Sequence, residues 1–150
     1  MNSWTTEVYA DERTGKAPLA AWVTGLSDPK FAALDAAIKH VLEVRGLELA
    51  GSAWLKPLGG GLHEFRVRHD AATIGRMFAR EAFAHATDES ILLRVFCHFY
   101  GDRVILLMSG YDKGRDTSEK RQQTEIQAAR TLLTAWQEAE KRTRAKRRQS

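Results

Sequence analysis

The sequence predicts an α+β domain, in which an antiparallel or mixed sheet of four to five strands carries an N-terminal helical hairpin and a C-terminal helix. Two observations predict this fold. Apolar residues recur at helical spacing near both ends of the chain, whereas the stretches between them alternate as strands do. A Gly-Asp pair also separates two strongly apolar runs, which is typical of a β-hairpin. We expect the helices to cover one face of the sheet.

The N-terminal helical hairpin is predicted over residues 18–46. Pro18 stands where the first turn of a helix tolerates proline, and an apolar stripe follows it. The sequence Ser27-Asp28-Pro29 ends this helix and starts a second one, which closes near Gly46. Such stripes usually face a core.

Four segments predict strands: residues 4–10 and 62–69 alternate in polarity, and residues 91–99 and 104–109 are apolar runs on either side of a turn. The Gly101-Asp102 pair joins the last two, since glycine supplies the positive φ of a tight turn.

Two further segments are harder to assign. Residues 51–61 contain three consecutive glycines but lack the Gly-Lys-Ser/Thr ending of a nucleotide-binding loop, so we expect a flexible connector. Residues 71–90 fit a short helix or an alternating strand, and the helix is preferred.

The C-terminal segment predicts a helix from Ser118 onward, with Ser118 in its cap region. Residues 141–148 carry six Lys or Arg. We expect one domain over residues 1–140 and a frayed basic tail over residues 141–150.

Charge and cysteine content bear on partners and compartment. Residues 111–150 carry 11 Lys or Arg against 6 Asp or Glu, whereas residues 1–50 carry 5 against 7. A basic end of this kind attracts acidic or nucleic-acid partners, although a solvated tail is the commoner explanation. A single cysteine, Cys97, fits a reducing compartment. With no signal peptide or membrane span evident, we expect a cytoplasmic protein that does not bind membranes.

Several short stretches share their order with a known family. They are Lys56-Pro57-Leu58, Gly61-Leu62-His63-Glu64-Phe65-Arg66, Leu93-Arg94-Val95-Phe96, Leu107-Met108-Ser109-Gly110-Tyr111-Asp112-Lys113 and Glu125-Ile126-Gln127-Ala128-Ala129-Arg130. In this order, on strands and a helix, they resemble the HigB-type, phage-derived host-killing branch of the RelE/ParE toxin superfamily.

This resemblance implies a RelE-like fold and the toxin role of a type II toxin-antitoxin system. It implies an endoribonuclease that cleaves messenger RNA, often on the ribosome, with no metal and no cofactor. It also implies a cognate antitoxin as partner, commonly a helix-turn-helix protein. The oligomeric state stays open.

Within the resemblance, Arg66 matches the arginine that ends the family's Glu-x-Arg strand, and Arg94 matches the arginine of the next strand. Lys113 matches the lysine after the family's Gly-aromatic pair. The family often has a second lysine there, whereas this chain has a glycine followed by Arg115. The connection before Arg94 is longer than in the family, so Arg76 is an alternative match to Arg94.

RNA cleavage without a metal requires in-line placement of the ribose 2′-OH, proton transfer and stabilisation of charge on the phosphate. Arginine suits the last task because its fork binds two phosphate oxygens and stays charged. A tyrosine offers a hydroxyl or a face for a base. The candidate catalytic residues are Arg66, Arg94, Lys113 and Tyr111, and the candidate RNA-binding residues are Lys56, Arg68, Arg76 and Arg115.

Each candidate also has a structural explanation. The arginines could face solvent or pair with Glu64 and Asp70, and Tyr111 fits a core position about as well as a site. His98 shares a strand face with Arg94 and would suit a proton acceptor, but a hydrogen-bonded core histidine is the better explanation. Cys97 alternates to the opposite face. No histidine has the spacing of a metal ligand.

Two other functions remain open from the sequence. One is a binding protein on the same scaffold that is non-catalytic or inhibits DNA gyrase, as the ParE-like branch does. The other is a nucleic-acid-binding accessory protein that uses its basic tail.

Overall fold

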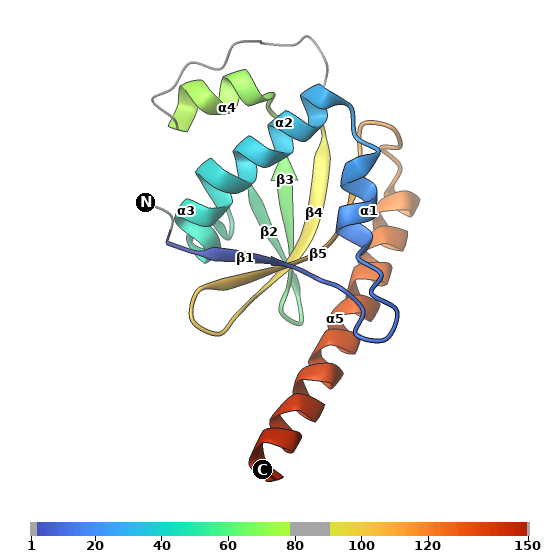
Figure 1. The fold of residues 1–150 in the computed structure, drawn as a ribbon. Helices are drawn as coiled ribbons and strands as arrows, with labels where there is room; N and C mark the ends of the chain where they lie inside the picture. The colour runs from blue at the N-terminus through green and yellow to red at the C-terminus, as the bar shows by residue number, and fades with distance from the viewer. Residues whose placement is uncertain (1–2, 79–90, 150) are drawn as a thin grey trace.

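The computed structural model describes residues 3–78 and 91–149, which form a five-stranded mixed sheet with helices against it (Figure 1). The strands are β1 (Thr5–Val8), β2 (Leu55–Gly59), β3 (Leu62–Val67), β4 (Leu93–Tyr100) and β5 (Val104–Asp112). Their order in the sheet is β1-β5-β4-β3-β2. β1 runs parallel to β5, and the other neighbouring strands are antiparallel. The predicted α+β class with a mixed sheet is therefore confirmed.

The helices occupy both ends of the chain and the connection after β3. They are α1 (Pro18–Thr24), α2 (Asp28–Ala37), α3 (Glu43–Arg45), α4 (Ala71–Phe78) and α5 (Glu119–Gln149), with a π-helical turn at Ile38–Leu42 and a 3₁₀ turn at Gly46–Leu49. The predicted N-terminal hairpin and C-terminal helix are present. The helical choice for the segment after residue 70 is confirmed up to Phe78, and the rest of that segment lies outside the described residues.

The sheet has a hydrophobic core on each face, so the expectation that all helices cover one face is wrong. One core joins α1, α2 and α4 to inward side chains of the central strands such as Phe65 and Val95. The other joins Ala129 and Leu133 of α5 to side chains such as Phe96 on the opposite face. Because apolar side chains point to both faces of the sheet, each face needs a helix to cover it. The predicted C-terminal helix covers the second face.

On the first of these two faces, aromatic rings pack closely against glycines. The ring of Trp22 in α1 lies against Gly110 of β5, and any Cβ at Gly110 would overlap it. Gly46, which ends α3 with a φ of 50°, leaves room in the same way for Trp4. The hydroxyl of Ser27 accepts a hydrogen bond from the Lys30 backbone N–H and caps α2, which begins where the sequence predicts a helix start.

Two sequence expectations about irregular segments need correction. The expected connector over residues 51–61 contains the edge strand β2, which pairs with β3 through a turn of positive-φ glycines. Proline is tolerated there because Pro57 lies on an edge strand. The segment expected to fray after residue 140 continues α5 to Gln149. Within residues 3–78 and 91–149, no helix has both the length and the apolar character needed to cross a membrane.

Candidate functional site

Three strands bring the predicted site residues into one row. Arg66 on β3 lies opposite Arg94 on β4, and Arg94 lies opposite Tyr111 on β5. Cross-strand partners point to the same face of a sheet. This face is the one that α5 covers, and the row lies near the N-terminal end of that helix, where Gln122 reaches β3. We call Arg66, Arg94, Lys113 and the carboxylate between them, Glu64, the cationic cluster.

A buried carboxylate organises this cluster. The side chain of Glu64 is fully buried, and its Oε1 lies 3.0 Å from Arg66 Nε and 3.8 Å from Arg94 Nε. Its Oε2 accepts a hydrogen bond of 3.1 Å from Gln122 Nε2 of α5. Because a buried carboxylate without partners would be costly, these groups hold both oxygens in place. The pairing of Arg66 with Glu64, one of the structural alternatives, is thus present, and Glu64 orients the arginine.

Lys113 lies in the turn after β5 and interacts electrostatically with the other members of the cluster. Burial lowers the pKa of its ammonium group, and the positive charge of Arg94 lowers it further, against the opposing effect of Glu64. Burial is also the main cause of the lowered pKa of Arg94, to which the charges of Arg66 and Arg68 contribute. One carboxylate therefore faces several cations, and the excess positive charge suits a bound anion.

Two of the predicted catalytic residues are buried. Arg94 is 3% exposed and Tyr111 is 1% exposed. The Tyr111 ring stacks on Phe96 with centroids 6.1 Å apart, and the Arg121 guanidinium lies over it at 5.4 Å. Tyr111 is therefore a core side chain and is not placed to stack on a base, which corrects that interpretation. Within the described part of the chain, its hydroxyl and Arg94 Nε have no hydrogen-bond partner.

The four predicted RNA-binding residues lie in four different places. Arg68 is exposed just beyond the end of β3 and acts electrostatically on the cluster. Lys56 is exposed on the edge strand β2, where it lies opposite Glu64 of β3. Arg115 is 81% exposed and lies 4.0 Å from Asp112, beside a hollow of about 470 Å³ next to α1 and α2.

Arg76 is not an equivalent of Arg94. It lies on α4, where Nη2 donates to the Thr73 hydroxyl at 3.2 Å. Ile74 of this helix belongs to the core on the opposite face of the sheet from Glu64 and Arg94. Arg76 therefore lies apart from Glu64 and Arg66, whereas Arg94 lies beside them.

The histidine and cysteine of β4 lie away from the cluster. His98 shares the face of Arg94, as expected, but its Nδ1 is 2.8 Å from the carbonyl oxygen of Gly61 and its ring lies beside Trp136. Cys97 is buried in the opposite core, and burial raises the pKa of its thiol. In residues 3–78 and 91–149, no group of three or more His, Cys, Asp or Glu is arranged to hold a metal ion.

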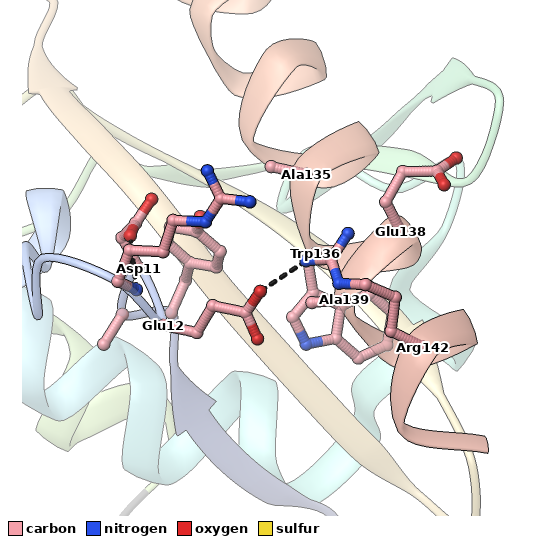
Figure 2. A pocket seen from close by; sticks show the side chains of 10 residues that line it. Asp11, Glu12, Ala135, Trp136, Glu138, Ala139 and Arg142 are labelled. Carbon is pink, nitrogen blue, oxygen red and sulfur yellow. Dashed lines mark hydrogen bonds and ion pairs between the residues drawn. The ribbon is translucent and has the colours of Figure 1, made fainter. Parts of the chain in front are cut away.

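A separate hollow of about 270 Å³ lies between the loop after β1 and α5 (Figure 2). Glu12 reaches across it to form an ion pair with Arg142. Asp11 accepts hydrogen bonds from the backbone N–H groups of Arg13 and Thr14 and so fixes the loop. One ion pair in this hollow thus joins the loop to the helix, and Asp11 acts within the loop.

Sequence reasoning missed the contribution of α5 and α2 to the site. Gln122 and Arg121 follow the cap residue Ser118 by one turn. The predicted start of this helix could therefore have indicated that they lie near the site. Lys30 of α2 forms an ion pair of 2.6 Å with Asp112, the residue before Lys113. No local pattern indicates this pair, since 82 residues separate its members.

Comparison with known proteins finds no relative of this chain. No family model matches the chain, and neither the curated proteins nor the solved structures that were searched contain a significant match.

Proposed function

We propose that this protein is a RelE-like toxin that cleaves single-stranded messenger RNA without a metal, with the cationic cluster as its phosphate-binding site. The observation that carries the proposal is the row formed by Arg66 and Arg94 on neighbouring strands, with Lys113 beside it and one shared carboxylate. The family resemblance of the strand sequences supports the same proposal. The proposed partner is an antitoxin, and the proposed location is the cytoplasm.

The reaction proceeds through the ribose itself. The 2′ oxygen attacks the adjacent phosphorus, the bond from phosphorus to the 5′ oxygen breaks, and a 2′,3′-cyclic phosphate forms. The 2′-OH proton passes to solvent water, and the departing 5′ oxygen takes one up from solvent. The accessible cations of the cluster, Arg66 and Lys113, stabilise the negative charge on the phosphate oxygens. Arg94 is buried, so it acts by orienting Glu64 and by adding positive potential.

The first prediction concerns Lys113, because its removal tests the chemistry with little risk to the fold. Lys113→Met removes a cation that burial and neighbouring cations already disfavour, so the stability should be unchanged or slightly higher. We expect cleavage to fall by about 100-fold or more, as for the loss of other groups that stabilise transition-state charge. The measurement is 5′-end mapping of RNA incubated with the protein and a metal chelator, with and without active ribosomes.

Arg76→Ala is the matched control, since it removes one positive charge from α4 on the far side of the sheet. It should cleave as the unmodified protein does, and it should arrest growth on expression. Equal cleavage by Lys113→Met and Arg76→Ala would refute the assignment of the site. Intact RNA in every reaction of the unmodified protein would refute the nuclease function.

The burial of Arg94 and Tyr111 favours one second candidate, a protein that binds RNA or another polyanion without cleaving it. The reachable groups of the cluster are cations, which bind phosphate but are poor proton acceptors at neutral pH. This candidate predicts RNA binding that weakens on Lys113→Met, with no cyclic phosphate product. Inhibition of DNA supercoiling would indicate its gyrase-directed form.

A further inference from the structure

A cluster of aromatic rings that the proposed reaction does not use lies between β4 and the middle of α5. We call His98, Tyr100 and Trp136 the aromatic cluster. The rings of His98 and Tyr100 are nearly parallel, at 4° and with centroids 6.3 Å apart. Trp136 meets them edge-on, at 5.5 Å from His98 and 4.6 Å from Tyr100. All three side chains are half-buried, so the cluster closes the second core and still faces solvent.

Hydrogen bonds hold these rings in place before any ligand arrives. His98 Nδ1 lies 2.8 Å from the carbonyl oxygen of Gly61, and the Tyr100 hydroxyl donates to Glu7 Oε2 at 2.7 Å. Burial and this hydrogen bond raise the pKa of Tyr100 to about 12, so the ring stays neutral near pH 7. A preformed surface lowers the entropic cost of stacking.

Cations line the other side of the same groove. The helical turns after residue 140 place three basic side chains there, and we call Lys141, Arg144 and Arg147 the basic wall. The groove has a volume of about 620 Å³ and runs between the β4–β5 turn and the C-terminal half of α5. Among the described residues, Glu140 is the acidic one that lines it. Figure 1 shows this half of α5 projecting beyond the sheet.

We propose that this groove binds a single-stranded RNA segment, with a base stacked on the aromatic cluster and phosphates on the basic wall. Rings beside cations are the combination that binds single strands, because every base has a face to stack and every linkage carries a charge. An acidic protein segment would satisfy the basic wall but would leave the rings unused. The proposal rests on the proposed function for the choice of RNA, and it adds a second contact at the opposite end of α5 from the cationic cluster.

The test is a titration with a short single-stranded RNA whose 2′-hydroxyls are methylated, so that it binds but cannot be cleaved by 2′-OH attack. Fluorescence anisotropy gives the affinity, and tryptophan emission reports stacking. We expect quenching that Trp136→Phe largely removes. Arg144→Ala should weaken binding several-fold and reduce the slope of log affinity against log salt by about one. The matched control is Lys146→Ala, which removes the same charge from a position outside the groove.

A strand of the same length without bases separates stacking from charge. It should bind at least about fivefold more weakly and leave Trp136 emission unchanged, as expected for the loss of one stacked base. Polyglutamate should not quench Trp136. Equal effects of Arg144→Ala and Lys146→Ala, quenching that survives in Trp136→Phe, or equal binding of the baseless strand or polyglutamate would each overturn the proposal.

The outcomes for the two sites are distinguishable. Lys113→Met should lose cleavage and keep the Trp136 quenching, because the cationic cluster and the groove lie at different ends of α5. Cleavage by the unmodified protein without quenching would refute the groove alone. Quenching without cleavage would refute the nuclease and leave the groove as an RNA-binding site.

Discussion

At the residue scale, the balance of charge around Glu64 decides what the site does. One buried carboxylate is shared by Arg66 and Arg94 at 3.0 and 3.8 Å, while Lys113 and Arg68 add positive charge without a comparable partner of their own in the described ion pairs. The site therefore keeps an unneutralised positive potential that a phosphate can match. Alternation along the strand predicts only that Glu64 and Arg66 share a face. The structure shows in addition that they form an ion pair.

The second prediction is the alkaline limit of cleavage. Lys113 is proposed to act as a cation, so activity should be lost as the pH rises through its pKa. Since burial and the charge of Arg94 lower that pKa, the loss should begin at a lower pH than an ordinary lysine would give. Lys113→Arg should shift the loss to higher pH, because a guanidinium stays charged. The measurement is the cleavage rate against pH, corrected for spontaneous hydrolysis with Lys113→Met. An identical alkaline limit in Lys113→Arg would show that Lys113 is not the titrating group.

At the element scale, the sequence predicts the strands and helices better than it predicts their register. The strands with strong alternation and the capped helices were predictable, whereas β2 was missed because its glycines and Pro57 resemble a linker. The site depends on an irregularity that no pattern shows. A register shift between Phe96 and Cys97 places Tyr111, and not Gly110, opposite Arg94. Because such a bulge adds one residue, it turns Tyr111 to the face that α5 covers.

The third prediction concerns the ion pair that joins α2 to the end of β5. Lys30 and Asp112 are 14% and 8% exposed and 2.6 Å apart. Asp112 also accepts the backbone N–H of Gly114 at 2.9 Å, so it fixes the turn that carries Lys113. Lys30→Met should lower the free energy of unfolding by about 1–3 kcal/mol, the cost of a buried acceptor left short of a partner. It should also slow cleavage by displacing Lys113.

Lys39→Met provides the control for this prediction. Lys39 pairs with Asp35 four residues earlier on the surface, at 3.0 Å and with both side chains at least 45% exposed. Its loss should cost less than about 0.5 kcal/mol. Urea denaturation of both variants measures the difference, and equal losses would show that the Lys30–Asp112 pair does not stabilise the fold.

At the scale of the whole molecule, one sheet separates two cores, and α5 is the helix that covers the second. Its first turns contact the cationic cluster through Gln122, its middle buries Leu133, and its last turns form the basic wall. The loop after β1 is tied to the same helix by the pair between Glu12 and Arg142. Both proposed RNA contacts therefore depend on the docking of α5.

The fourth prediction is that the two cores unfold together. Leu133 is 4% exposed in the second core, so Leu133→Ala should lower the free energy of unfolding by about 2–5 kcal/mol. Thr131→Ala on the exposed side of the same helix should cost little, since alanine favours a helix.

Far-ultraviolet circular dichroism and tryptophan emission, followed during urea denaturation, should give coincident transitions, because every central strand contributes side chains to both cores. If α5 detached first, the emission of Trp136 would change before the ellipticity of the sheet. Loss of RNA binding in Leu133→Ala would then reflect an undocked helix, and two separate transitions would contradict the dependence of both sites on one cooperative fold.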